Sequence, residues 1–423
     1  MSWIVPALAL IGAVAILWLL YAWIAPEPAD LLPDRIVFGG DQSADFLRTL
    51  ASHINAPIID GNRVELLENG VEIFPPMLDA IRNAEETIHL LTYIYWSGDI
   101  AVEFATALAD AAQRGVEVRV LLDAFGANRM EDRLIERMRN AGCQVRWFHG
   151  VKWYNLRRLN NRTHRKVLVI DGRVGFTGGV GIAAEWTGNA EDEDHWRDDH
   201  FCVTGPVVAY LQGGFAENWL DATGEVVAAP RLYPQLEPRG KARVLPILAS
   251  PRGDRSPVGL SYWLAFRTAR HRIDITTPYF VADRFLLEAM KDAVARGIRV
   301  RLLVPGDRTD SKLVHLASFP RYDELIRAGV LIHEYQPTLI HAKAMLVDDD
   351  LCMIGSANFD NRSFELNDEI VLYVRDADFT ALLSDSFERD LEQAVHITLD
   401  RYHEIPFWRR VLGHATLLLR EQL

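Results

Sequence analysis

Apolar residues recur along two stretches of the chain at the spacing of an amphipathic helix. Residues 101–114 and residues 285–296 both follow the 3.6-residue period that places apolar side chains on one face. Gly115 and Gly297 come next, at the position where a helix commonly ends. Each glycine is followed by a run rich in aliphatic and β-branched residues. Strands that alternate with helices in this way predict an α/β fold.

The same order of elements occurs twice along the chain, which indicates an internal repeat. Residues 114–121 match residues 296–303, and residues 88–93 parallel residues 273–279. In each half the pattern reads strand, helix, strand, helix, strand and a final strand. We therefore predict two α/β halves related by a pseudo-twofold axis, each with an open, mostly parallel sheet.

The N-terminal pattern differs from the rest of the chain. Residues 3–25 contain no charged residue and have about the length that a helix needs to cross a bilayer. A cleaved signal peptide is the alternative, but it requires a positive segment before a shorter apolar core, and only Met1 and Ser2 precede this run. The pattern predicts a single-pass transmembrane anchor that is not cleaved.

The C-terminal residues also carry a one-sided apolar pattern. A helix after Pro406 would collect on one face the side chains of Phe407, Trp408, Val411, Leu412, Ala415, Leu418 and Leu419. Such a helix is typical of membrane interfaces. Docking on the protein's own core explains the pattern equally well, so both interpretations stay open here.

These patterns divide the chain into six segments. The stretch before residue 243 is rich in proline and glycine and reads as a linker between the halves. The predicted segments are a transmembrane anchor (1–25), a juxtamembrane segment (26–62), the first half (63–225), the linker (226–243), the second half (244–402) and a C-terminal amphipathic helix (403–423).

One short motif occurs in both halves and carries the candidate chemistry. A histidine and a lysine lie two residues apart, and an aspartate follows the lysine by five residues. The six residues are His164, Lys166 and Asp171 in the first half, and His341, Lys343 and Asp348 in the second. The chain otherwise relies on arginine for positive charge, which indicates that these two positions need a compact ammonium group.

The motif suits the transfer of a phosphoryl-type group. Side chains two apart on a strand share a face, so a pseudo-twofold axis would bring two imidazoles and two ammonium groups together. The lysines would hold a phosphate and stabilise charge on its oxygens. One histidine would attack phosphorus, and the other would protonate the leaving alkoxide. This chemistry requires no metal and no cofactor. A single motif would be weak support, because a buried strand can carry it by chance.

The paired motifs resemble those of the phospholipase D superfamily. The sequence around them, at residues 161–172 and 355–369, resembles the bacterial cardiolipin synthase branch, and the resemblance extends from about residue 74 to residue 387. It implies a fold of two phospholipase D-like halves. It also implies an acidic residue further along each half that hydrogen-bonds the histidine. Glu369 matches this position in the second half, and Asp198 matches it in the first, with Asp199 as a competitor.

The resemblance implies roles for four more residues. Asp171 and Asp348 would be mainly structural and would hold the motif through ion pairs. Ser356 and Asn358 would hydrogen-bond phosphate oxygens.

The two half-sites are also expected to differ. The first half has Gly179 and Gly181 where the second has a serine and an asparagine, which implies that the half-sites do different work. The resemblance favours His164 as the nucleophile and His341 as the general acid and base, and the symmetry of the motifs leaves the reverse open.

The sequence around the first motif indicates the substrate class. Residues 146–173 contain eight lysines or arginines and several aromatic residues, a combination that binds nucleic acids or anionic membrane surfaces. The chain as a whole carries a net charge of −13, which disfavours a nucleic acid. The predicted partners are therefore phospholipids and the membrane bilayer, without nucleic acid.

These features together predict a membrane-anchored phosphatidyltransferase that makes cardiolipin through a phosphohistidine intermediate. Phosphatidylglycerol would accept the phosphatidyl group, and either phosphatidylglycerol or phosphatidylethanolamine would donate it. A bacterial inner membrane is the expected location. A phospholipid hydrolase is the alternative from the same fold, and a nuclease or a non-enzymatic scaffold fits less well. The membrane side of the catalytic part and the oligomeric state stay open.

Overall fold

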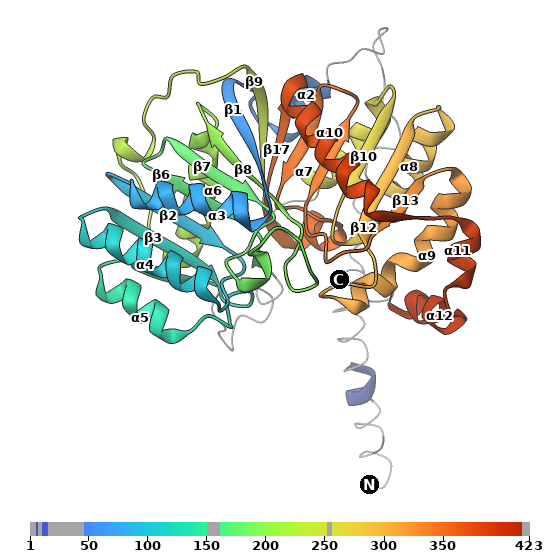
Figure 1. The fold of residues 1–423 in the computed structure, drawn as a ribbon, viewed down its shortest axis with the longest axis horizontal. Helices are drawn as coiled ribbons and strands as arrows, with labels where there is room; N and C mark the ends of the chain where they lie inside the picture. The colour runs from blue at the N-terminus through green and yellow to red at the C-terminus, as the bar shows by residue number, and fades with distance from the viewer. Residues whose placement is uncertain (1–5, 7–10, 16–45, 150–160, 252–255, 417–423) are drawn as a thin grey trace.

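A single sheet runs through the molecule and joins its two lobes (Figure 1). The computed structural model describes residues 6, 11–15, 46–149, 161–251 and 256–416. The predicted transmembrane anchor at residues 1–25 lies almost entirely outside them. Within the described ranges, no helix combines the length and the apolar character needed to cross a membrane.

The sheet has sixteen strands, and along its main path the strands of the two lobes lie on opposite sides of the junction between β1 and β9. The order across it is β18-β13-β12-β10-β14-β15-β17-β9-β1-β8-β7-β6-β2-β3-β4, and β5 pairs with β17 at one side. The strands of the first lobe are β1 (Ile59–Glu68), β2 (Thr87–Thr92), β3 (Glu117–Asp123), β4 (Gln144–Phe148), β5 (Arg162–Thr163), β6 (Val167–Ile170), β7 (Val174–Gly178) and β8 (Asp199–Thr204). Those of the second lobe are β9 (Ala242–Ala249), β10 (Arg272–Thr276), β12 (Arg299–Pro305), β13 (Leu331–Tyr335), β14 (Ala344–Val347), β15 (Leu351–Gly355), β17 (Asn367–Arg375) and β18 (Ala394–Ile397).

The prediction of mostly parallel sheets is wrong. Along the main path of the sheet, parallel pairs join only β2, β3 and β4 in the first lobe, and β10, β12 and β13 in the second. The inner strands pair antiparallel, including β1 with β9 where the lobes meet. The reason is that β6–β7 and β14–β15 are joined by tight turns, which reverse the chain, whereas a parallel pair needs a crossover such as a helix.

Helices cover both faces of the sheet (Figure 1). The two helices predicted from apolar periodicity are confirmed as α4 (Asp99–Gln113) and α8 (Arg284–Ala295). The other helices of the lobes are α3 (Asn69–Arg82), α5 (Asp132–Asn140), α6 (Val208–Thr223), α7 (Pro257–Thr268), α9 (Lys312–Ala328) and α10 (Ala377–Glu392). The N-terminal helix α2 (Phe46–Ile54) packs on α7, so it belongs to the core of the second lobe although it precedes the first lobe in sequence.

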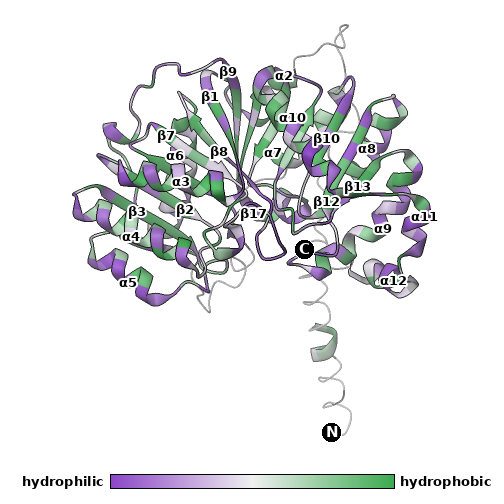
Figure 2. Cartoon of the chain, in the orientation of Figure 1, coloured by the Kyte–Doolittle hydropathy of each residue, from purple (hydrophilic) through white to green (hydrophobic). Residues whose placement is uncertain are grey.

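The apolar core is partly shared between the lobes. Adjacent residues of a buried strand face opposite sides, so Leu90 packs with α3 and α4 whereas Leu91 packs in a second core on the other face. That second core contains side chains from α6 of the first lobe and from α10 of the second. In Figure 2 the strands are largely hydrophobic and the polar residues lie mainly on the outer faces of the helices.

The C-terminal helix α12 (Phe407–Thr416) docks on α9 of the second lobe. Gly413 meets α9 so closely that an added Cβ would lie 2.4 Å from the carbonyl oxygen of Leu316. Trp408, Val411 and Leu412 remain exposed on the other side of the helix. Part of the predicted apolar pattern is therefore explained by docking, and part of it faces outward.

Candidate active site

The two motif histidines are held by the opposite lobe. The backbone N–H of His164 donates to the carbonyl oxygen of Asp368 at 2.9 Å, next to the short parallel pairing of β5 with β17. The backbone N–H of His341 donates in the same way to the carbonyl oxygen of Arg197 at 2.6 Å. Each motif segment is thus docked beside the segment that carries the predicted acid of the other lobe.

The histidine–acid pairs therefore cross between the lobes. Nδ1 of His164 lies 2.9 Å from Oε1 of Glu369, and Nδ1 of His341 lies 2.7 Å from Oδ2 of Asp198. The sequence had indicated an acid within the same half as its histidine, and the structure corrects this point. Because each carboxylate accepts from Nδ1–H, the lone pair of each imidazole is left on Nε2. Asp198 makes this contact, whereas Asp199 is bound to Arg197.

Both motif lysines are almost completely buried beside the histidines, each with a side chain about 2% exposed. Nζ of Lys166 donates to the carbonyl oxygen of His164 at 3.0 Å. Nζ of Lys343 donates to the carbonyl oxygen of His341 and lies against the same imidazole, 2.8 Å from Nδ1 and 3.1 Å from Nε2. His164, Lys166 and His341 line one cavity of about 580 Å³, which contains side chains of both lobes. The structure thus brings the two motifs together, as the sequence predicted.

Burial sets the charge state of this cavity. It lowers the pKa of His164 to about 4 against the opposing charge of Glu369, and together with the Lys343 ammonium it lowers the pKa of His341 to about 3. Burial also lowers the pKa of Lys166 to about 7, with help from the second ammonium, and that of Lys343 to about 8. Near neutral pH the two imidazoles are therefore neutral.

The two acids remain ionised in this setting. Burial alone would raise the pKa of Glu369 and of Asp198. The hydrogen-bonded histidine and the neighbouring lysine outweigh that effect in each case and hold both pKa values below the usual range. The site therefore combines two ionised carboxylates with two lysines whose protonated form is disfavoured by burial, and a bound anion would favour that protonated form.

The motif aspartates are structural, but they do not act through ion pairs as expected. The carboxylate of Asp171 accepts the backbone N–H groups of residues 85–87, at 2.7 to 3.0 Å. Asp348 accepts those of residues 270–272 in the same way, at 2.8 to 3.2 Å. Both aspartates have positive φ, at 52° and 54°, in the turns that follow β6 and β14. They tie those turns to the start of β2 and β10.

The difference between the small-residue turns has a steric cause. Oγ of Ser356 donates to Oε2 of Glu369 at 2.5 Å. At the equivalent Gly179, an added Cβ would lie 2.1 Å from Oδ1 of Asp198, so only glycine leaves room for that carboxylate. Asp198 instead accepts from Nε1–H of Trp186 at 2.8 Å. The Ser356 hydroxyl is therefore committed to positioning Glu369.

The second pair of small-turn positions also differs. Asn358 lines the cavity, and within the described residues its Oδ1 has no hydrogen-bond partner. At the equivalent Gly181, an added Cβ would lie 2.7 Å from Ile94 and 3.0 Å from the Trp186 ring. An aromatic side chain of the first lobe thus occupies the space that the asparagine has in the second.

Comparison with known proteins identifies the family. The family model described as "Cardiolipin synthase, PLD-like domain" matches residues 77–201 and 264–391. The chain belongs to this family. Each matched segment contains one complete motif and one of the two acids, Asp198 in the first and Glu369 in the second. The pseudo-twofold repeat of the structure is therefore a repeat of the family domain.

Curated relatives and a solved structure agree with this placement. The chain is 36% identical to cardiolipin synthase A of Pseudomonas syringae pv. syringae (strain B728a), over 85% of this chain and 74% of the relative. It is 36% identical to cardiolipin synthase 2 of Bacillus anthracis, over 84% of this chain and 69% of the relative. The crystal structure of phosphatidylserine synthase from Haemophilus influenzae Rd KW20 has the same fold, with a TM-score of 0.68 at 17% identity, over 89% of this chain and 100% of that structure.

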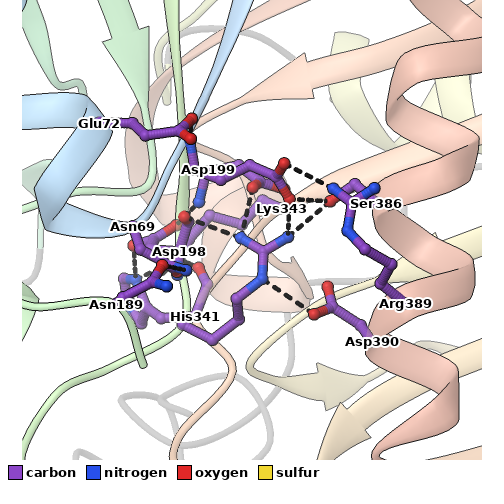
Figure 3. A network of polar contacts seen from close by, with 12 residues as sticks. Asn69, Glu72, Asn189, Asp198, Asp199, His341, Lys343, Ser386, Arg389 and Asp390 are labelled. Carbon is purple, nitrogen blue, oxygen red and sulfur yellow. Dashed lines mark hydrogen bonds and ion pairs between the residues drawn. The ribbon is translucent and has the colours of Figure 1, made fainter. Parts of the chain in front are cut away.

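Two buried arginines support this cardiolipin synthase-like site, and sequence reasoning missed both. Arg197 lies at the boundary of the lobes, where its guanidinium donates to Asp199 at 2.5 Å and to Glu68 at 3.2 Å, both from the first lobe. Figure 3 shows Asp199 of the first lobe close to Ser386 and Asp390 of the second. Arg197 also donates to Asp390 at 2.9 Å and to Ser386 at 2.7 Å, both on α10 of the second lobe. Its position one residue before Asp198 was visible in the sequence, but its burial was not.

Arg165 is the corresponding cross-lobe contact beside the first motif. Its guanidinium is fully buried and donates to the carbonyl oxygens of Gly214 at 3.0 Å and Ala249 at 2.9 Å, which belong to different lobes. It also donates to the carbonyl oxygen of Glu369 at 3.2 Å and pairs with Glu217 at 2.9 Å. The residue between His164 and Lys166 therefore fixes the backbone of the acid that His164 uses.

Proposed function

We propose that this chain is a phosphatidyltransferase that makes cardiolipin. One histidine would take the phosphatidyl group from a phospholipid, and the resulting phosphatidyl-histidine would pass it to a hydroxyl of phosphatidylglycerol. The observation that carries the proposal is a pair of buried imidazoles that face one cavity, each hydrogen-bonded to a carboxylate of the other lobe. Lys166 lines the same cavity, and Lys343 lies beside His341. The cardiolipin synthases among the relatives support the same reaction.

Each group in the cavity has a defined task in this proposal. Nε2 of one histidine attacks phosphorus, and the bond from phosphorus to the headgroup oxygen breaks. The other histidine gives that oxygen a proton, and in the second step it takes the proton of the incoming hydroxyl. Lys166 and Lys343 hold the phosphate oxygens. The negative charge of a bound phosphodiester raises the pKa of both histidines, so proton transfer improves once the lipid is in place.

The reaction itself gives the first test. Purified protein in vesicles of labelled phosphatidylglycerol should release glycerol and form cardiolipin without nucleotide or added metal, because one phosphodiester bond replaces another. Formation of phosphatidic acid alone, even at high phosphatidylglycerol, would replace the transferase by a hydrolase. Vesicles that contain phosphatidylethanolamine as well distinguish the two donors, since ethanolamine then appears as the leaving group.

The proposal includes attachment to a bacterial inner membrane. Residues 3–25 supply an apolar span in the sequence. Near the cavity, Phe125 is 56% exposed, and Leu313, next to the lining residue Val314, is 54% exposed. Together with the outward side of α12, these apolar side chains fit contact with lipid. In the same assay the chain should sediment with the vesicles, and full activity in the supernatant would contradict attachment.

The pKa values of the lysines predict how activity depends on pH. Both ammonium groups must be protonated to hold a phosphate, so kcat/KM should fall as the pH rises through about 7 and about 8, the pKa values of Lys166 and Lys343. The nucleophilic histidine reacts when neutral, and a pKa of about 4 for His164 imposes no loss near neutral pH. The other histidine must carry a proton to act as general acid, so its protonation adds to the fall in activity as the pH rises. Initial rates at low substrate concentration measure this dependence.

The pH profile of kcat provides the control for this interpretation. Bound phosphate stabilises the ammonium groups, so the decline of kcat should lie at higher pH than that of kcat/KM. A value of kcat/KM that rises steadily to high pH would show that the lysines do not need their protons.

A further inference from the structure

The two ends of the cavity differ in charge at positions that the pseudo-twofold axis relates. Thr163 pairs with Asp368 in one lobe contact, and Ile340 pairs with Arg197 in the other. This correspondence relates the residues two before each histidine, which are Arg162 and Leu339. It also relates the residues two before each acid, which are Asn367 and Trp196.

A third related pair follows the small-residue turns. Arg362 and Glu185 each lie seven residues after the glycine that ends β15 or β7, Gly355 or Gly178. Both side chains line the cavity. At this position, too, the end of the cavity beside Arg162 is cationic, whereas the related position at the other end is anionic.

One end of the cavity thus carries two arginines, Arg162 and Arg362, beside Asn367, and is called here the cationic end. Asp360 also lines the cavity and interacts with Arg362, and the other lining arginine, Arg129, stacks on Trp96. The related positions carry Glu185, Trp196 and the buried Leu339. We infer that the cationic end binds the phosphate of the acceptor phospholipid, an inference that rests on the proposed transferase function. Arginine is suited to this task because its planar group forms two parallel hydrogen bonds to a phosphate.

Contacts in the first lobe hold Arg162 in place. Its guanidinium carbon lies 3.7 Å from the ring centroid of Phe125, and one terminal nitrogen donates to the hydroxyl of Tyr93 at 3.2 Å. Arg362 comes from the second lobe, and burial together with the charge of Arg162 lowers its pKa. Both guanidinium groups line the same cavity from different lobes, and an anion bound between them would stabilise both charges.

The chemistry of the product explains why only one end carries this charge. Cardiolipin has two phosphates joined by one glycerol. The phosphate that reacts is bound between the histidines, and the second phosphate arrives with the acceptor. In the transfer step the acceptor hydroxyl oxygen forms a new bond to phosphorus, the bond from phosphorus to the histidine nitrogen breaks, and the hydroxyl proton goes to the other histidine. Water and free glycerol lack the second phosphate and gain nothing from the cationic end.

The test compares a phosphate-bearing acceptor with one that has no phosphate. In phosphatidylglycerol vesicles supplied with labelled glycerol, cardiolipin formation reports transfer to the lipid, and label entering phosphatidylglycerol reports transfer to glycerol. Arg162→Leu places at this position the residue that the related position of the same fold already has. We expect the ratio of the two rates to fall about 10- to 100-fold, the range for loss of a charge-assisted hydrogen-bonded contact.

Matched variants separate this inference from other causes. Arg162→Lys keeps the charge and should recover part of the ratio, and Arg137→Leu on the exposed side of α5 removes the same charge elsewhere and should leave the ratio as in the wild type. Equal losses of both products in Arg162→Leu, or no change in their ratio, would overturn the acceptor site. Absence of cardiolipin with the wild-type chain would instead refute the proposed function.

Discussion

Replacing His164 or His341 by alanine is expected to abolish cardiolipin formation, with the protein still folded. One imidazole carries the phosphatidyl group and the other transfers the protons. General acid–base catalysis alone contributes about 10²- to 10⁴-fold to the rate. The loss should be measured as the rate of cardiolipin formation, alongside the thermal unfolding of each variant. A histidine variant that loses less than about tenfold would not hold this role.

The two histidine variants should differ in kind. Family resemblance makes His164 the nucleophile, so His164→Ala should form no phosphatidyl-enzyme. His341→Ala should still form some when the leaving group is good and needs no proton. Trapping the intermediate in His164→Ala but not in His341→Ala would reverse the assignment while keeping the mechanism. Activity in both variants, without any phosphohistidine, would rule out the phosphohistidine mechanism.

Because each histidine pairs with an acid of the other lobe, variants of the two acids provide a further test of the histidine roles. Glu369 belongs to the second lobe but holds His164, so Glu369→Gln should reproduce the defect of the first-motif variant in a milder form. Asp198→Asn should likewise reproduce the defect of His341→Ala. An amide keeps the shape of the side chain but loses the charge that stabilises an imidazolium. If each acid variant instead matched the histidine of its own half, the crossed arrangement would be contradicted.

Replacing Arg197 by methionine is expected to give the largest loss of stability. Its guanidinium is the common partner of Glu68, Asp199 and Asp390, all in a buried or nearly buried setting. Burial raises the pKa of Asp199 to about 7 even with the arginine present. Removing one partner of a buried ion pair costs about 3–5 kcal/mol of unfolding free energy, because the other charges stay behind. Urea unfolding measures the change.

Arg389 provides a matched control for this experiment. It pairs with Glu68 at 2.6 Å in the same network, but its side chain is 55% exposed. Arg389→Met should therefore change the unfolding free energy by less than about 1 kcal/mol. Equal midpoints for the two variants would show that the buried guanidinium does not hold the lobes together.

The sequence predicted those features that depend on local pattern. Helices α4 and α8 were visible in their 3.6-residue period. The convergence of the motifs followed from their repeat, because two copies of one fold can meet about a twofold axis. The two acids were assigned from the family resemblance, and the structure places each beside a motif histidine.

The features that were missed depend on how the lobes dock. Strand direction could not be derived from apolar alternation, since parallel and antiparallel strands share a period of two. The pairing of Glu369 with His164 exists only because β17 approaches β5 of the other lobe. The sequence pattern did not distinguish a buried arginine such as Arg197 from an exposed one. The family resemblance had implied ion pairs for Asp171. Its carboxylate instead accepts backbone N–H groups, an arrangement that depends on a turn with positive φ that the sequence pattern did not reveal.

The continuous sheet restricts how lipids reach the histidines. A hinge that opened the lobes would have to break the antiparallel pairing of β1 with β9 and the parallel pairing of β5 with β17. It would also pull both histidines from their carboxylates at the same moment, since both pairs cross the boundary. The enzyme would then lose its nucleophile and its proton carrier together. Substrate exchange with the lobes closed, through the rim of the cavity, avoids that loss and lets a covalently held phosphatidyl group wait in an intact site for its acceptor.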